Sequence, residues 1–293
     1  MDLGRRHLIG GAIASGMIGS IASAQGAQHP SGQPARQVID QRVSQFAIGP
    51  ADKPWRILVG MPRVAPPANG YSVIMALDGN ATFPTLWDLR ETMAPDAPVV
   101  LIGVGYPIET RNDVTRRWYD LTSPGKVPVP ARPDLRGPGD RPTGGQDEFL
   151  GMITGDLLPR LMRDLPLDRS DMTLYGHSLG GLFVLHTLFT RPDLFARHVA
   201  ADPSTWWNAG EVLREAAAFR GGVLAAGGRL DPARPLLIAS AGAREPDILA
   251  RLTGLPGLDL IHCPHPGESH GSLIDPSLGQ AFDLHLARLS PLQ

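Results

Sequence analysis

Residues 174–181 read Leu174-Tyr-Gly-His-Ser-Leu-Gly-Gly181 and contain the pattern G-x-S-x-G around Ser178. The stretch 171–175 predicts a strand and the stretch 181–189 predicts a helix. In this context the pattern is typical of a nucleophile elbow, a strand-to-helix turn that raises the serine hydroxyl at the edge of a sheet and frees the backbone N–H of Leu179 for an oxyanion. Chance is the alternative, because the chain has 34 glycines, but the flanking strand and helix favour the catalytic interpretation.

The first 24 residues have the composition of a secretory signal. A basic start contains Arg5-Arg6, an apolar and small-residue run covers 8–21, and Ala22-Ser-Ala24 resembles a cleavage site. The arginine pair predicts the twin-arginine export route and a periplasmic or secreted protein. A stable membrane anchor is the alternative, but the run is short and rich in glycine and serine, whereas a spanning helix needs about 20 apolar residues.

The remainder of the chain fits one large domain. Residues 25–293 carry 25 basic and 28 acidic residues, a net charge of −3, which argues against a nucleic-acid partner. Cys263 is the only cysteine, so no internal disulfide is expected. We expect a flexible linker over 25–36, rich in Gly, Pro, Gln and Ser, and a folded domain over 37–293.

Apolar runs alternate with helical patterns along this domain. Strands are predicted over 55–60, 71–77, 99–104, 173–175, 198–201, 236–240 and 258–263, and helices near 82–93, 148–164, 181–190, 209–219, 245–253 and 276–289. Several of the strands are continuously apolar, as in a sheet covered on both faces. The fold class predicted is therefore α/β, with a mostly parallel sheet and helices on both faces.

One segment lacks any helical or strand period. Residues 124–145 contain six prolines and five glycines. Long irregular loops in compact domains are commonly functional. We interpret this one as a loop over the active-site end of the sheet, with a solvated loop of no role as the alternative.

Position along the chain selects the base. In an α/β-hydrolase the catalytic triad follows the order serine, acid, histidine. His270 lies in a turn after the last predicted strand and before the last helix, where the base belongs, and His265 is its competitor. A zinc site built from these two residues and His262 is not favoured, because no known ligand spacing matches. His177 is adjacent to the serine, and we expect the elbow to direct its side chain away.

The acid is expected after the strand over 236–240. Glu245 is our choice there and Asp247 is the alternative; both could instead be first-turn helix residues stabilised by the helix dipole. A serine–histidine pair without an acid is a further possibility.

A second oxyanion donor is expected in the loop after an early strand. Asp78-Gly79-Asn80 follows the strand over 71–77. The backbone N–H of Gly79 or of Asn80 is therefore the candidate partner for that of Leu179.

An ordered set of short motifs along residues 40–290 resembles a known family, the esterase D-like group of α/β-hydrolases. The motifs are Asp78-Gly-Asn80, Arg117-x-x-Asp-Leu-Thr122, Gly144-Gly-x-x-x-Phe149, Gly176-His-Ser-Leu-Gly-Gly181, Asp202-Pro-Ser-x-Trp-Trp207 and Glu268-Ser-His-Gly271. Its nearest branch is the periplasmic siderophore esterases that open trilactone scaffolds such as enterobactin.

The resemblance implies ester hydrolysis without a metal or an organic cofactor. It also implies that Arg117 helps to hold an anionic substrate; a structural pair with Asp120 or simple exposure is the alternative. Trp206 and Trp207 would line an aromatic pocket or serve only in packing. Ser204 is a weaker candidate. The chain departs from the family pattern at Thr122-Ser-Pro124, where the family has Thr-Pro.

These observations predict a serine carboxylic-ester hydrolase whose partner is a small-molecule ester of the siderophore type. An acyltransferase of the same fold and a non-catalytic binding protein are the alternatives, and a peptidase is not favoured because no peptide-binding domain is evident. The oligomeric state is not indicated by the sequence.

Overall fold

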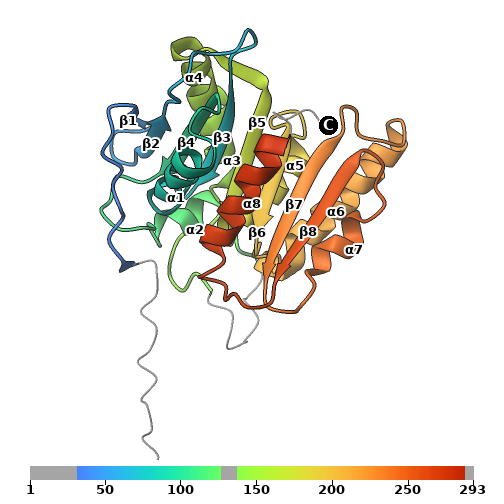
Figure 1. Ribbon diagram of the computed structural model, residues 1–293. Coiled ribbons are helices and arrows are strands. Elements are labelled where there is room, and N and C mark those ends of the chain that lie inside the picture. The colour runs from blue at the N-terminus through green and yellow to red at the C-terminus, as the bar shows by residue number, and fades with distance from the viewer. Residues whose placement is uncertain (1–31, 127–136, 288–293) are drawn as a thin grey trace, which may run out of the picture.

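The computed structural model of the chain describes residues 32–126 and 137–287 (Figure 1). Residues 1–31, which include the predicted signal and most of the predicted linker, lie outside this part. Within it, no helix combines the length and the apolar character needed to cross a membrane.

Eight strands form one sheet in the order β1-β2-β4-β3-β5-β6-β7-β8. β1 and β2 run antiparallel at one edge, and the six strands from β4 to β8 are parallel to one another. The strands are β1 (Val43–Ile48), β2 (Trp55–Gly60), β3 (Tyr71–Leu77), β4 (Val99–Gly105), β5 (Leu167–His177), β6 (Arg197–Ala201), β7 (Arg234–Ala241) and β8 (Leu258–His265).

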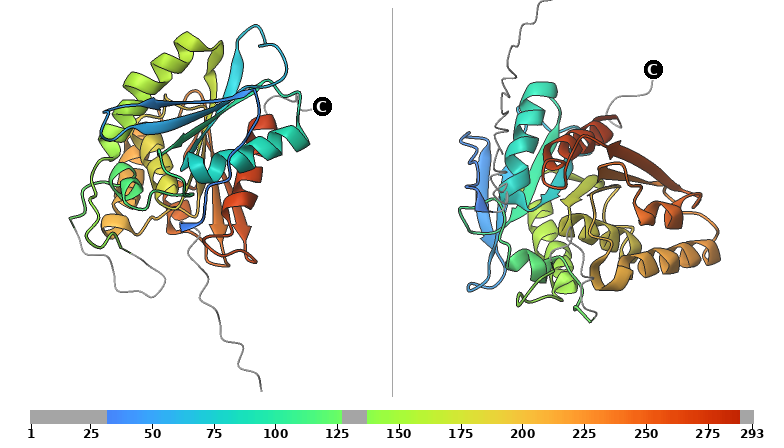
Figure 2. Two further views of the ribbon diagram at one scale, coloured as in Figure 1. Left: turned by 90° about the vertical axis from the view of Figure 1, so that its left-hand side faces the viewer. Right: turned by 90° about the horizontal axis from the view of Figure 1, so that it is seen from below.

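Helices cover both faces of the sheet. Seen from below, α1 and α8 lie on one face and the other helices on the opposite face (Figure 2, right). The helices are α1 (Gly79–Met93), α2 (Arg116–Asp120), α3 (Gln146–Met152), α4 (Leu158–Asp164), α5 (Leu179–Thr190), α6 (Trp207–Ala225), α7 (Asp247–Leu252) and α8 (Ile274–Ala287), with a π-helical turn over Ile153–Leu157 between α3 and α4. The predicted α/β class is confirmed by this architecture.

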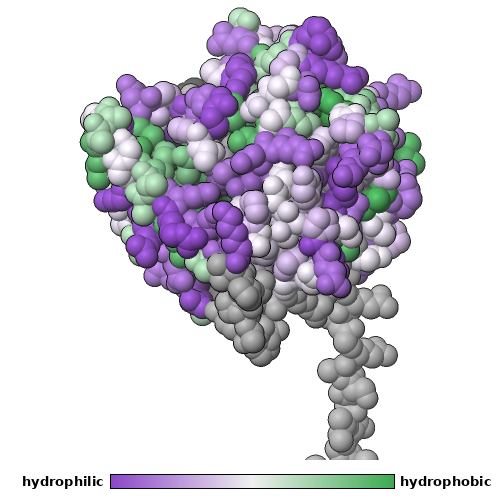
Figure 3. Space-filling view, turned by 180° about the vertical axis from the view of Figure 1, so that it is seen from behind, coloured by the Kyte–Doolittle hydropathy of each residue, from purple (hydrophilic) through white to green (hydrophobic). Residues whose placement is uncertain are grey.

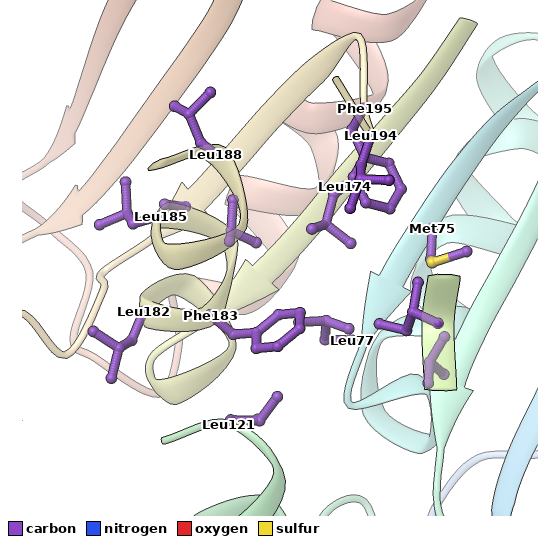
Figure 4. Packing of buried hydrophobic residues seen from close by; sticks show 14 of the residues in the cluster. Met75, Leu77, Leu121, Leu174, Leu182, Phe183, Leu185, Leu188, Leu194 and Phe195 are labelled. Atoms are coloured by element: carbon purple, nitrogen blue, oxygen red, sulfur yellow. The ribbon is translucent and has the colours of Figure 1, made fainter. Parts of the chain in front are cut away.

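The core consists of two apolar layers, one on each face of the sheet. β3 and β4 are buried along their whole length, which explains their continuous apolar sequences. Alternate residues of β3 face opposite layers, so that Leu77 belongs to one and Ala76 to the other. Phe183 of α5 points across toward Leu77 (Figure 4), and burying such an aromatic side chain contributes about 2–3 kcal/mol. The nucleophile helix is thereby fixed to the sheet.

Two elements were not predicted, and several extend beyond their predicted bounds, β5 and β8 among them. β1 alternates half-buried and exposed residues and α2 has only five residues, so neither has a strong apolar pattern. β5 begins at Leu167, before the predicted starts at 171 and 173, in a polar stretch that is partly exposed. β8 continues to His265, so this histidine lies in a strand and not in the following turn.

The surface on the side of α3 to α6 is mixed in character. Figure 3 shows this face, on which hydrophilic side chains are interspersed with smaller hydrophobic areas. The site described next lies where β3, β5, β6 and β8 end, at the carboxyl edge of the parallel strands, where α/β sheets bind their ligands.

Candidate active site

Ser178 stands in a strained turn between β5 and α5. Its backbone has φ 61° and ψ −115°, a conformation unfavourable for a residue with a side chain and typical of functional sites. A Cβ on Gly176 would lie only 2.3 Å from the carbonyl oxygen of Gly180, so this glycine is sterically required. A Cβ on Gly180 would meet its nearest atoms at an ordinary 3.6 Å. The predicted elbow geometry is present, but of these two glycines only Gly176 is demanded by sterics.

Ser178 and His270 are brought together although they are 92 positions apart in the chain. His270 lies in the loop between β8 and α8, and its Nε2 is 3.0 Å from the hydroxyl oxygen of Ser178. On the other side of the ring, Nδ1 is 2.5 Å from Oδ2 of Asp202. The three side chains therefore form a continuous serine–histidine–carboxylate relay.

The positions of the protons follow from the chemistry of the three groups. Burial alone would raise the pKa of Asp202, but the hydrogen bond and charge of His270, together with the N–H of Ala241, outweigh burial and hold this pKa below its usual value. The ionised carboxylate accepts the Nδ1 proton, so that Nε2 of the neutral ring accepts from Ser178. The Ser178 oxygen then accepts from the hydroxyl of Ser204, 3.3 Å away and buried. Ser204 thus contacts the reacting oxygen.

The acid expected at Glu245 is Asp202 in the structure. β6 is paired directly with β5, and Ser178 N donates to Ala201 O at 2.9 Å, so the residue after β6 lies beside the serine. Glu245 follows β7, one strand farther out, and is exposed. The alternative, Asp247, pairs with Arg244 at 3.3 Å. The strand order decides between these carboxylates, and it is not visible in the sequence.

His177 also differs from the prediction that its side chain is directed away. Its ring centroid lies 4.6 Å from that of His270. Its Nε2 is 2.7 Å from the backbone carbonyl oxygen of His270, which can only accept, so Nε2 carries the proton. Burial lowers the pKa of His177 to about 3. His177 is therefore a neutral donor that holds the loop carrying the base.

The predicted oxyanion donors lie at two helix starts. The N–H groups of Ala81 and Thr82 donate to the carbonyl of Asp78, and those of Gly79 and Asn80 precede this first hydrogen bond of α1. The Asn80 side chain is engaged elsewhere, since Nδ2 donates to the carbonyl of Tyr106 at 3.0 Å and Oδ1 accepts from its N–H. Leu179 N–H opens α5 directly after the serine.

The Arg117 side chain is largely buried and is paired with a carboxylate. It forms a two-point pair with Asp78, with distances of 3.0 and 2.9 Å. Asp120, the partner considered from the sequence, is instead 3.5 Å from Arg116. In this structure the Nε and Nη2 edge of the Arg117 guanidinium is therefore engaged by a carboxylate of the protein itself.

The two tryptophans differ in their surroundings. Trp207 is 2% exposed and its Nε1 donates to Ser123, so it is a packing residue and not part of an open pocket. Trp206 is half-buried, with its ring centroid 6.4 Å from that of Trp118. Of the pair, only Trp206 is partly exposed.

The first described end of the Pro/Gly-rich loop is bonded to the start of α6. Lys126 N–H donates to Oδ1 of Asn208 at 3.0 Å, and Nδ2 of Asn208 donates to the carbonyl of Pro124. At the returning end, Gly144 N–H donates to the carbonyl of Thr122 at 3.1 Å and Gly145 N–H donates to that of Tyr119 at 2.8 Å. The middle of the loop, 127–136, lies outside the described residues. Over 32–126 and 137–287 no cluster of three metal-ligating side chains occurs.

Comparison with known proteins places the chain among esterases. It matches the family model described as "Putative esterase" over residues 51–223. It is 32% identical over 255 residues to the ferri-bacillibactin esterase BesA of Bacillus subtilis, a match that covers 80% of this chain and 86% of that protein.

Two further matches extend this result. The siderophore enterobactin esterase of Emericella nidulans is 37% identical over 208 residues, which is 67% of each chain. The crystal structure of the BES protein from Bacillus cereus superposes with a TM-score of 0.71 at 27% identity, covering 85% of this chain and 98% of that one.

Proposed function

The chain belongs to the Putative esterase family and is a serine ester hydrolase, and from this premise we propose that it hydrolyses siderophore esters with Ser178, His270 and Asp202 as its catalytic residues. The observation that carries the proposal is the relay itself, with contacts of 3.0 Å and 2.5 Å around the imidazole of His270. The substrate class is taken from relatives whose names describe them as siderophore esterases.

The reaction begins when the Ser178 oxygen attacks the acyl carbon of the ester. Nε2 of His270 takes the serine proton, and Asp202 stabilises the imidazolium and holds the useful tautomer. The negative charge on the former carbonyl oxygen is accepted by the N–H of Leu179 and by that of Gly79 or Asn80. As the intermediate collapses, His270 returns the proton to the leaving alcohol and an acyl-enzyme remains.

Water completes the cycle by the same steps in the second half-reaction. His270 removes a proton from water, the hydroxide attacks the acyl-enzyme, and Ser178 leaves with the returned proton, so the products are a carboxylic acid and an alcohol. The His270 side chain is 56% exposed. This openness supports access for bulky esters, and it favours water as the acceptor over the acyltransferase alternative because solvent reaches the base directly.

Substrate ranking tests the siderophore part of the proposal. We expect kcat/KM for a catecholate trilactone to exceed that for a simple acetate ester by about 10²-fold, since binding energy from the rest of the scaffold lowers the barrier. Mass spectrometry of the opened product, with Ser178→Ala as the control, measures it. The reverse ranking would reject a siderophore substrate, and binding without turnover by the wild type would favour a binding protein.

The exported location is a further part of the proposal. It rests on the composition of residues 1–24, and the relatives' activity on siderophores is compatible with it. Sequencing of the mature N-terminus is expected to begin near Gln25. An intact Met1 in the secreted form would contradict export by cleavage.

A further inference from the structure

A buried charged pair ties two loops of the active site together. Arg117 donates from Nε to Oδ1 of Asp78 at 3.0 Å and from Nη2 to Oδ2 at 2.9 Å. The arginine side chain is 15% exposed and the aspartate 6%. Nη2 also lies 3.5 Å from the carbonyl oxygen of His177. One guanidinium thus contacts both the residue that follows β3 and the residue that precedes the nucleophile.

Asp78 adopts a backbone conformation that needs support from outside the loop. It has φ 52° and ψ 47° and makes no side-chain capping bond to α1, although left-handed geometry is unfavourable for residues other than glycine. Its carboxylate is held by Arg117 instead. A Cβ on Gly180 would lie 3.6 Å from Oδ2 of Asp78, which shows how closely this carboxylate packs against the elbow.

The backbone after Asp78 has little freedom to compensate for a shift. A Cβ on Gly79 would be 2.6 Å from the carbonyl carbon of Gly103, so this residue packs directly on β4. The Asn80 side chain fixes the next position through its bonds to Tyr106. The direction of the N–H groups of Gly79 and Asn80 is therefore set by the turn at Asp78.

We infer that Arg117 is a positioning residue that acts through Asp78 to aim the N–H groups of Gly79 and Asn80 at the oxyanion, and that it does not bind anionic groups of the substrate. The inference rests on the proposed function of those N–H groups. A substrate carboxylate on the same edge of the guanidinium would displace Asp78. It would leave a buried carboxylate without its partner, which is strongly unfavourable.

A comparison of a neutral and an anionic ester that share one leaving group distinguishes a positioning role of Arg117 from a role in substrate binding. Arg117→Lys keeps the positive charge but loses the planar fork. For neutral 4-nitrophenyl butyrate and anionic 4-nitrophenyl hemisuccinate, we expect kcat to fall by the same factor, about 10–10²-fold, with KM nearly unchanged. Arg116→Lys is the matched control, because Arg116 lies next along α2 but contacts Asp120 and the Pro54 carbonyl, and it is expected to keep wild-type rates.

A double-mutant cycle with Asp78→Asn tests whether Arg117 acts through Asp78. If it does, the double variant loses no more activity than the more damaged single variant. The inference is overturned if the fold losses in kcat of the two single variants multiply in the double variant. It is also overturned if Arg117→Lys changes only the KM of the anionic ester, or if both single variants keep the wild-type kcat. Thermal melts by circular dichroism verify that each variant is folded. If Arg117→Lys does not fold, Asp78→Asn is assayed on the two esters instead, and an equal fall in kcat on both, with KM nearly unchanged, is again the expected result.

The outcome is independent of the natural substrate, because both esters are simple ones. If the enzyme prefers simple acetate esters to a catecholate trilactone, the ratio of kcat between wild type and Arg117→Lys on the two simple esters still tests the positioning role. Conversely, normal turnover of a trilactone together with unchanged Arg117→Lys rates would contradict only the positioning role.

Discussion

Replacement of Asp202 by asparagine distinguishes the relay in the structure from the one expected from sequence order. The side chain keeps its size but loses its charge. An amide NH2 turned toward His270 favours the imidazole tautomer with its proton on Nε2, and that atom can then no longer accept the proton of Ser178. The variant therefore loses both the tautomer and the stabilisation of the imidazolium, and we expect a lower kcat.

The exposure of the pair sets the size of the effect. Opposite charges about 4 Å apart attract by about 1 kcal/mol in water and about 4 kcal/mol at an effective dielectric constant of about 20. The side chains of His270 and Asp202 are 56% and 27% exposed, so the pair lies between these limits. A loss of about 3 kcal/mol corresponds to about 10²-fold in kcat. This is smaller than the roughly 10⁴-fold loss for a buried triad, because water partly replaces the carboxylate.

Initial rates with 4-nitrophenyl butyrate measure this loss. Glu245→Gln and Asp247→Asn are the matched controls, since each removes one carboxylate near the same sheet edge, and we expect both to retain wild-type kcat. KM of Asp202→Asn should change little, because the carboxylate acts mainly in the transition state. A wild-type kcat in Asp202→Asn, or the large loss in Glu245→Gln, would refute the assignment of Asp202.

Three further predictions concern other parts of the site and its support. Burial disfavours protonation of His186, but Glu215 at 3.1 Å and a second carboxylate outweigh burial and raise the His186 pKa. Stability from this pair is thus complete below the unfolded pKa of about 6.5 and is lost as pH rises through the raised folded pKa; denaturant unfolding should show His186→Gln costing about 2 kcal/mol at acid pH and less at alkaline pH, and a constant cost would contradict this. Gly176→Ala should abolish folding or lower Tm severely, whereas Gly180→Ala should shift stability by at most about 1 kcal/mol, because only the first Cβ meets backbone at 2.3 Å; equal melts would contradict the steric account. Ser204→Ala removes a donor to the nucleophile's oxygen and should lower kcat about fivefold to tenfold at constant KM, while an unchanged kcat would assign this hydroxyl to packing.

Most of the fold could be predicted from the sequence because its strands are apolar runs separated by helical patterns. The edge strand β1 and the short helix α2 could not, since neither buries a continuous apolar face. The elbow was recognisable because its constraint is local. Gly176 must lack a Cβ for a turn that closes within five residues.

The rest of the site depends on contacts between distant parts of the chain. Asp202 lies beside the base because β6 pairs with β5. In the sequence it was visible as an aspartate directly after an apolar strand and as the first residue of the motif Asp202-Pro-Ser, but neither signal marked it as the acid. Arg117 meets Asp78 across 39 positions. A family pattern suggests a substrate contact for this arginine, but only the folded chain shows that its Nε and Nη2 donate to Asp78.

Covalent labelling with a fluorophosphonate tests the central claim most directly, because the probe reacts with a serine only where a base and oxyanion donors converge on it. Peptide mass spectrometry is expected to find stoichiometric modification of Ser178 in the wild type, none in Ser178→Ala, and greatly slowed labelling in His270→Ala. Modification of a different serine, or undiminished labelling of Ser178→Ala, would contradict the assignment of Ser178 as the nucleophile.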